Sequence, residues 1–300
     1  MKYKSIFKLC LLTTFLSVAT ISCDDWTEME IHDSQVNGFK EQNPQEYAAY
    51  TQNLRAYKAT KHAVVYARLD NAPEVSTGEK DFLRALPDSI DIVTMRNADR
   101  LSEYDREDMK LVREDYGTKV LYYIDCTAKD KLNTSITSAV EAVRTGTFDG
   151  LALGSEGSAV DVSALKSLLD ALGQTPCLLV FEGTPSLLPE AQRSLFNYFV
   201  LDISAASDEY DIETSVLYAT GYGKAAPDRL LLAVTPDGTL TDYNGVTRNA
   251  IAGAAYGALN METPLGGIAI YNISTDYYDT DIIYKQTRGG IQFLNPASAH

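Results

Sequence analysis

The sequence predicts a (β/α)8 barrel, and three observations support that prediction. After His62, short apolar runs alternate with amphipathic helical stretches, which is the pattern of a parallel sheet covered on its outer face. Eight such units fill about 240 residues, the usual size of this barrel. A doubly wound open sheet is the main alternative. It normally has a glycine-rich phosphate turn after its first strand, whereas Leu69-Asp-Asn-Ala-Pro73 follows here.

The predicted strands are short runs of aliphatic, aromatic and β-branched residues. They are Ala63–Leu69, Ile90–Met95, Lys119–Ile124, Gly150–Leu153, Cys177–Phe181, Tyr198–Ile203, Leu230–Val234 and Ile268–Ile273. The helices between them carry apolar residues three and four positions apart. The clearest are Asp105–Tyr116, Leu132–Thr145, Val162–Leu172 and Asn249–Asn260. A further helix, Gln45–Lys58, leads into the barrel, which we expect to be a single domain over residues 61–300.

The N-terminus predicts export. Three lysines precede the apolar run Leu11–Ile21, which is too short to span a bilayer. Residues 1–22 resemble a lipoprotein signal peptide that ends before Cys23, the residue that would be lipidated; ordinary secretion with cleavage near Ser22 is the alternative. Asp24 and Asp25 resemble the acidic export tag of Bacteroides-type surface lipoproteins. We therefore expect residues 23–60 to form a lipidated tether with a lead-in helix, on a protein anchored at the outer-membrane cell surface.

Charge and composition narrow the classes of ligand. Without the three lysines of the signal, 23 basic residues remain against 41 acidic ones, a net charge of −18. Such a surface disfavours nucleic acid and is compatible with a neutral ligand such as a glycan, although solubility on an anionic cell surface explains it equally well. No cluster of Cys and His has metal-binding spacing, so we expect no metal and no cofactor. Cys126 and Cys177 lie at the ends of predicted strands that would not be neighbours, which favours two free, buried thiols over a disulfide.

Polar side chains follow most of the predicted strands. In a (β/α)8 barrel the carboxyl ends of the strands form the mouth where ligands bind. A tyrosine has a flat apolar face and a hydroxyl, and both suit a pyranose ring, so we add tyrosines from these loops. The candidate ligand-binding residues are Asp70, Asn71, Asp125, Glu182, Asp202, Tyr243, Tyr271 and Asn272. Tyr277 and Tyr278 are further candidates for an exposed aromatic surface.

The segment Phe148-Asp-Gly-Leu-Ala-Leu-Gly-Ser-Glu-Gly157 resembles the strand-four signature D-G-x-D-x-D-x-E of the family 18 glycoside hydrolases. The opening Asp149-Gly150 and the closing Glu156 are present, but Ala152 and Gly154 occupy the two middle carboxylate positions. Two further segments are similar to the endo-β-N-acetylglucosaminidases of that family. They are Leu86–Val93 at strand two and Gly266–Asn272 at strand eight. The resemblance spans nearly all of residues 62–284.

The resemblance implies a retaining mechanism that uses the substrate's own N-acetyl group. Glu156 matches the general acid, and the missing carboxylate at Gly154 would orient and stabilise the N-acetyl group. Losing one such preorganised group costs roughly 3–4 kcal/mol of barrier, or about 10²–10³ in rate. Asp125, Glu182 or Asp202 could replace it. A plainer alternative is that Glu156 belongs to a flexible loop and Asp149-Gly150 to a turn.

The sequence leaves three functions open. The first is a surface glycan-binding protein without hydrolytic activity, which would present N-acetylglucosamine-containing oligosaccharides, such as N-glycans, to outer-membrane glycan uptake proteins. The second is an active endo-β-N-acetylglucosaminidase with a rewired carboxylate. The third is a structural role with no sugar site. The first two follow from the resemblance and from the predicted location, not from any single residue.

Overall fold

The computed structural model describes residues 39–72, 75–128 and 132–296. The predicted signal, Cys23 and the acidic residues after it lie outside this range. The chain divides into two compact units, Met1–Ala48 and Ala49–His300. The described part of the first unit is helical: α2 covers Phe39–Gln42, and α3, Pro44–Lys58, begins there and continues into the second unit. Within the described residues no helix is both long and apolar enough to cross a membrane.

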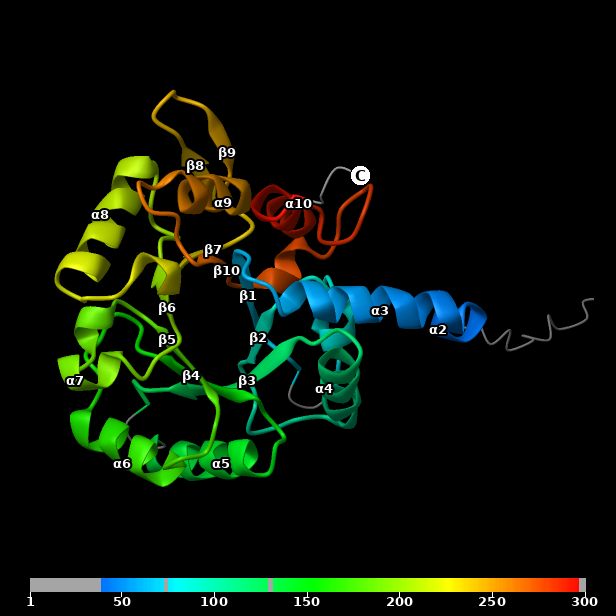
Figure 1. Ribbon diagram of the computed structural model, residues 1–300, viewed down its shortest axis with the longest axis horizontal. Coiled ribbons are helices and arrows are strands. Elements are labelled where there is room, and N and C mark those ends of the chain that lie inside the picture. Colours follow the sequence, from blue (N-terminus) through cyan, green and yellow to red (C-terminus); the bar gives the residue numbers. More distant parts are fainter. Residues whose placement is uncertain (1–38, 73–74, 129–131, 297–300) are drawn as a thin grey trace, which may run out of the picture. The chain divides into compact units, whose positions relative to one another are not determined.

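The second unit is the predicted (β/α)8 barrel (Figure 1). Eight parallel strands close in the order β1-β10-β7-β6-β5-β4-β3-β2. Their bounds agree with the predicted runs to within three residues at either end. They are β1 Val64–Leu69, β2 Ile92–Met95, β3 Lys119–Asp125, β4 Gly150–Gly154, β5 Leu178–Glu182, β6 Tyr198–Asp202, β7 Leu230–Val234 and β10 Gly267–Ile270.

Helices surround the strands, and the four helices predicted between strands are present. The helices of the barrel are α4 Glu103–Glu114, α5 Leu132–Arg144, α6 Val162–Leu172, α7 Glu190–Arg193, α8 Glu209–Gly221, α9 Ala250–Asn260 and α10 Lys285–Leu294. After β1 the chain forms two short 3₁₀ helices, η1 Glu79–Asp81 and η2 Leu83–Ala85, where a barrel usually has a full helix. An antiparallel hairpin, β8 Thr239–Thr241 and β9 Thr247–Asn249, is inserted after β7. The sequence analysis did not predict it.

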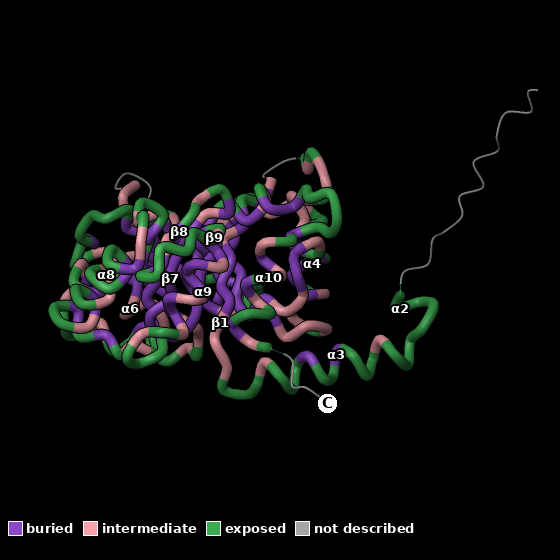
Figure 2. The backbone as a smooth tube through the Cα atoms, turned by 90° about the horizontal axis from the view of Figure 1, so that it is seen from above, coloured by how far each residue is buried: buried purple, intermediate pink, exposed green. Residues whose placement is uncertain are grey.

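The strands of the barrel are mostly buried (Figure 2). Apolar side chains fill the interior. Because side chains alternate along a strand, every second residue of each strand points inward. At mid-height these include Tyr66, Ala152, Val180 and Ala269, each with no exposed surface. The interior is therefore a packed core and not a channel, so a ligand can reach only the two ends of the barrel.

Both described ends of the second unit meet the barrel at the amino ends of its strands. The Arg55 guanidinium of α3 donates to the Asp115 carbonyl at 2.6 Å. Lys58 Nζ donates to the carbonyl oxygens of Asp88 and Ile90, each at 2.6 Å. After α10, the Asn295 side chain pairs with the backbone of Ala63, just before β1. These contacts place both described ends of this unit at the amino ends of the strands, opposite the barrel mouth.

Candidate functional site

The first half of the strand-four motif has a structural role at the amino end of β4. The Asp149 carboxylate accepts a hydrogen bond from the Val120 backbone at 2.9 Å and pairs with Arg113 at 2.9 Å. A Cβ atom on Gly150 would lie 1.9 Å from the Leu178 carbonyl oxygen, so only glycine fits between β4 and β5. Asp149-Gly150 therefore joins β3, β4 and β5. Packing alone explains why an aspartate and a glycine occur at these two positions.

Tyr123 occupies the space where the missing carboxylate of position 154 would project. A Cβ atom on Gly154 would lie 2.0 Å from the Tyr123 hydroxyl oxygen and 2.6 Å from its Cζ. Tyr123 comes from β3, next to β4, and the residue is 7% exposed. The change to glycine thus leaves no empty hole, because a neighbouring side chain fills the space.

The other two motif positions also lack a usable carboxylate inside the barrel. Ala152 is fully buried among the inward-facing core residues. Glu156 lies two residues beyond the end of β4, in an exposed turn with a left-handed backbone (φ 45°). A non-glycine residue in this region is uncommon. The predicted acid therefore projects from the rim loop and is not fixed in the mouth by the strand.

A buried ion pair crosses the barrel just below the mouth. Arg68 Nη1 donates to Glu182 Oε2 at 3.1 Å, and the two side chains are 18% and 3% exposed. Because β1 and β5 are four strands apart in either direction, this pair spans the barrel from side to side. Tyr66 donates to the other Glu182 oxygen at 2.6 Å and forms a second, very short hydrogen bond with Thr94. Glu182 is thus engaged on both oxygens.

Two arginines lie flat on tyrosine rings in the same layer. The Arg68 guanidinium carbon is 3.7 Å from the centre of the Tyr271 ring, and that of Arg96 is 4.5 Å from the Tyr123 ring. Burial, and then the Glu182 charge, raise the pKa of Tyr271 well above its ordinary value, so its hydroxyl stays protonated. Burial opposes the charge on Arg68, but Glu182, Tyr271 and Tyr123 together more than offset this, and the pKa of Arg68 is raised. The layer is a closed, charge-balanced floor.

The candidate ligand residues separate into buried and exposed groups. Glu182 and Tyr271 belong to the closed floor, and Asn71 is fully buried, where its side chain holds Asn97 and Asp105. These three are inaccessible to a ligand in this structure. The other candidates keep exposed or partly exposed side chains around the mouth. They are Asp70, Asp125, Asp202, Tyr243 and Asn272.

Some of the exposed candidates also have local structural roles. Asp125 accepts from the backbone and hydroxyl of Thr127, and Asp202 accepts from the Ser204 backbone. Asp70 lies 3.7 Å from Arg96. Of the two additional tyrosines, Tyr278 is exposed, whereas Tyr277 is buried and donates to Glu79.

The floor residues Tyr66, Arg68 and Tyr123 were not among the candidates. Their positions carry a signal, because Tyr66 and Arg68 alternate along β1 and therefore share its inward face. A charged residue on the inward face needs a buried partner. The pairing of Arg68 with Glu182, 114 residues away, depends on barrel closure and cannot be read from spacing.

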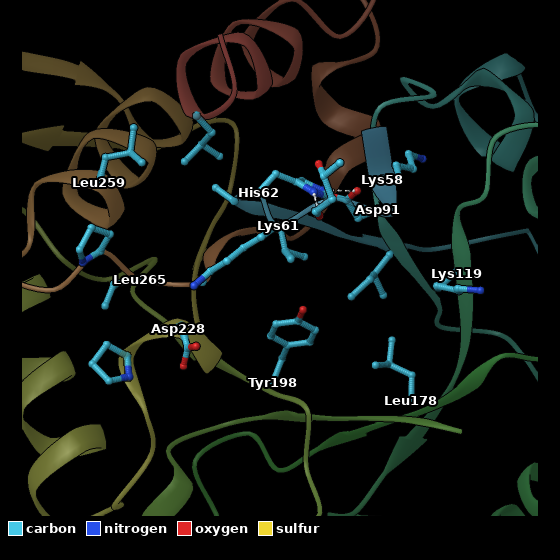
Figure 3. A pocket seen from close by; sticks show the side chains of 18 of the residues that line it. Lys58, Lys61, His62, Asp91, Lys119, Leu178, Tyr198, Asp228, Leu259 and Leu265 are labelled. Atoms are coloured by element: carbon cyan, nitrogen blue, oxygen red, sulfur yellow. Dashed lines mark hydrogen bonds and ion pairs between the residues drawn. The ribbon is translucent and has the colours of Figure 1, made fainter. Parts of the chain in front are cut away.

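A cavity of about 910 Å³ lies at the opposite end of the barrel (Figure 3). Its lining includes Lys61, Tyr198 and Asp228, and the Tyr198 hydroxyl points into it. His62 lies at its edge, with Nε2 2.9 Å from Asp91 Oδ1 and Nδ1 2.8 Å from the Thr60 carbonyl oxygen. Both partners are acceptors, which favours a protonated ring with two donors. Asp91 also accepts from the Val65 backbone at 2.8 Å, so this pair fixes the start of β1.

His62 should make stability depend on pH. Its hydrogen bond with Asp91 raises the pKa of His62 above 6.5, although burial opposes the shift. The stabilisation is therefore complete below the unfolded-state pKa and is lost as pH rises through the folded-state value. Relative to wild type, His62→Gln should lose about 1–2 kcal/mol of unfolding free energy at pH 5.5, and the loss should shrink by pH 9.

Urea unfolding across this pH range measures the difference. Lys61→Gln is the matched control, because Lys61 is a neighbouring exposed cation. A loss for His62→Gln that is the same at every pH would show that the ion pair does not contribute.

The remaining expectations concern sulfur and metals. Cys126 and Cys177 are free thiols, as predicted, but both are half-buried and not fully buried. Burial, and then Asp125, raise the pKa of Cys126 to about 12, which leaves it an unreactive thiol at neutral pH. Among the described residues no group of His, Cys, Asp and Glu could hold a metal ion.

Comparisons with known proteins agree with the fold. A family model described as "Glycoside hydrolase family 18, BT1044-like" matches residues 27–152 and so ends two residues before Gly154. A structure of BT1044 has a TM-score of 0.70 at 18% identity, covering 86% of this chain and 95% of that protein. Comparison with curated protein sequences gives no match.

Structures of two other proteins extend the comparison. An endo-β-N-acetylglucosaminidase from Cordyceps militaris has a TM-score of 0.60 at 17% identity, covering 83% of this chain and 96% of that enzyme. A mutant of it, in complex with fucosyl-N-acetylglucosamine-Asn, aligns with the same values. A family 18 chitinase from Pseudoalteromonas aurantia has a TM-score of 0.57 at 12% identity, covering 77% and 100%. At these identities the structures show the fold, and the family model adds a sequence similarity over residues 27–152. The chain is therefore a (β/α)8 barrel protein that is similar to the family 18 glycoside hydrolases.

Proposed function

We propose that this protein binds glycans through the mouth side of its barrel and does not hydrolyse them. The observation that carries the proposal is the Tyr123 ring over Gly154, in the space that the stabilising carboxylate of the family motif would need. The Arg68–Glu182 pair supports it, because it closes the floor on which a bound sugar would have to be distorted. Without a fixed carboxylate at this position, the activation barrier of hydrolysis would be higher by roughly 3–4 kcal/mol.

The proposed ligand class follows from the similar proteins. The Cordyceps enzyme acts on N-acetylglucosamine linkages by its name, and its mutant is seen with a fucosylated N-acetylglucosamine linked to Asn. An N-acetylglucosamine-containing glycan, such as an N-glycan, is therefore the first ligand to test. The acidic surface, with a formal net charge of −15 for the whole chain, favours a neutral glycan over an anionic one.

The proposed location follows from the N-terminal sequence. A lipid on Cys23 and the acidic residues after it would place the barrel at the outer-membrane cell surface. There the protein would capture oligosaccharide and pass it to outer-membrane glycan uptake proteins. Metabolic labelling with a palmitate analogue tests the first step, since Cys23→Ser should abolish incorporation of the label.

A second candidate function, an active endo-β-N-acetylglucosaminidase, keeps one specific observation in its favour. Asp125 of β3 lies in register with Gly154 of β4, so a carboxylate stands next to the vacated position. Asp125 is partly exposed, and one of its oxygens is already engaged by Thr127. If hydrolysis occurs, Asp125 is the residue that would replace the lost group.

Mass spectrometry of an N-glycosylated protein separates the two functions. We expect no cleavage between the core N-acetylglucosamines after incubation with residues 24–300, together with retention of this protein on a glycan column. Cleavage above background would overturn the proposal. Glu156→Gln and Asp125→Asn would then show whether those carboxylates carry the activity. If the protein neither cleaves the glycan nor is retained on the column, there is no sugar site.

A further inference from the structure

A pocket of about 400 Å³ lies beside the barrel mouth, between η1–η2 and α4 on one side and the segment after β10 on the other. We call it the rim pocket. Its lining residues are Glu79, Phe82, Arg84, Ala85, Tyr104, Tyr277 and Ile283. Tyr104 is in the first turn of α4, which follows β2, and Tyr277 follows β10 through a 3₁₀ turn. Both residues therefore reach the pocket from the carboxyl ends of strands.

Aromatic rings form the walls of the rim pocket. Phe82 and Tyr104 pack edge to face with their centres 5.5 Å apart, and Tyr104 is 56% exposed. Tyr277 packs edge to face against Tyr278, which is also exposed, at 4.8 Å. The Ser274 hydroxyl donates to the Lys80 carbonyl at 3.0 Å and so ties the two sides together. An exposed ring held by a second ring is a rigid, flat surface.

The polar groups of the rim pocket are held in place but keep spare hydrogen-bonding capacity. One Glu79 oxygen accepts from Tyr277, and Arg84 pairs with Asp108 through Nε and with Glu107 through Nη2. Within the described residues, the second Glu79 oxygen, Arg84 Nη1 and the Tyr104 hydroxyl have no protein partner. One acceptor, one donor and one group that can do either therefore surround an apolar wall. With Asp108 and Glu107 behind Arg84, the local charge is negative and disfavours an anionic ligand.

We propose that the rim pocket is a sugar-binding subsite that takes one neutral pyranose, with the apolar face of the ring stacked on Tyr104. This inference rests on the proposed glycan-binding function and gives it a location. The mouth floor is closed by Arg68 and Tyr123, whereas the rim pocket combines an open aromatic face with fixed polar groups. Small-molecule sites commonly have this composition, and pockets of about 300–1,000 Å³ are their usual size.

Isothermal titration calorimetry of residues 24–300 with N,N′-diacetylchitobiose and with the N-glycan core pentasaccharide tests the subsite. We expect Tyr104→Ala to weaken binding of at least one of these sugars by about tenfold, since it removes the stacking face. Tyr104→Phe keeps the ring and should lose no more than about threefold. Tyr222→Ala is the matched control, because this tyrosine is also exposed but lies at the carboxyl end of α8, away from the mouth.

The outcomes separate the subsite from the proposed function. Weaker binding for Tyr104→Ala with unchanged binding for Tyr222→Ala supports both. Wild-type binding that Tyr104→Ala leaves unchanged overturns the rim subsite and keeps the glycan-binding function. An equal loss in both variants also overturns the subsite, because it shows no local effect. If the wild-type protein binds neither sugar, the subsite is overturned. If the glycan column also fails to retain the protein, the proposed glycan-binding function is overturned as well.

Discussion

Restoring the family carboxylate through Gly154→Asp should destabilise the barrel and create no active site. The new Cβ would lie 2.0 Å from the Tyr123 hydroxyl oxygen, and the two nearest ring carbons would be 2.6 and 2.7 Å away. Tyr123 cannot move aside freely, since Arg96 covers its ring. Overpacking of a filled core costs about 1–3 kcal/mol, and the poorly solvated carboxylate adds to this. We expect a loss of about 3 kcal/mol and a melting temperature about 10 °C lower.

Thermal unfolding measures this effect, and Gly289→Asp is its control. Gly289 is an exposed glycine of α10 with nothing within 4 Å of a new Cβ, so the same substitution should change stability little. Adding Tyr123→Ala to Gly154→Asp should recover part of the lost stability by removing the clash. A melting temperature for Gly154→Asp equal to that of wild type would mean that Tyr123 does not hold the position we describe.

Removing one partner of the Arg68–Glu182 pair should have a comparable or larger effect. Glu182→Leu leaves the Arg68 guanidinium with no counter-charge in a layer where its side chain is only 18% exposed. The Tyr66 hydroxyl also loses its acceptor. Breaking a buried pair in this way typically costs 3–5 kcal/mol. We expect Glu182→Leu to lower the free energy of unfolding by about that amount.

A double-mutant cycle shows whether the effect belongs to the pair. Arg68→Met alone should also destabilise, because it leaves Glu182 buried and uncompensated. Combining Arg68→Met with Glu182→Leu should destabilise by less than the sum of the two, since the apolar side chains then fill the floor without a stranded charge. Additive losses in urea unfolding would contradict a direct interaction across the barrel.

Much of the fold was predictable because each strand is locally unambiguous. The apolar runs are short, buried on both faces and separated by amphipathic stretches, and these patterns fix the number of strands and their parallel pairing. Leu230–Val234 and Val162–Leu172 were predicted with the bounds that the structure shows. The β8–β9 hairpin was not, because Thr239–Thr241 and Thr247–Asn249 are short and polar and are positioned by packing on α9.

The candidate site was harder to predict because its defining contacts join distant parts of the chain. The resemblance drew attention to β4 and matched Glu156 to the general acid. The strand ends at Gly154, and the left-handed backbone of Glu156 directs the chain away. That Tyr123 fills the place above Gly154 depends on the register between β3 and β4. Asn71 looked like a ligand residue, yet it forms buried hydrogen bonds to Asn97 and Asp105 that no local pattern reveals.

The contacts of Lys58 and Asn295 with the amino ends of the strands determine how the barrel is presented to its surroundings. Residues 49–58 lead into the barrel from that face, and the chain leaves α10 on the same face, beside Ala63. The mouth and the rim pocket are at the far end of the strands. We therefore expect a support attached at residue 49 or at residue 296, such as a sensor chip or a fused partner, to leave the mouth and the rim pocket accessible. The two modes of attachment should present the same surface to a large glycoprotein.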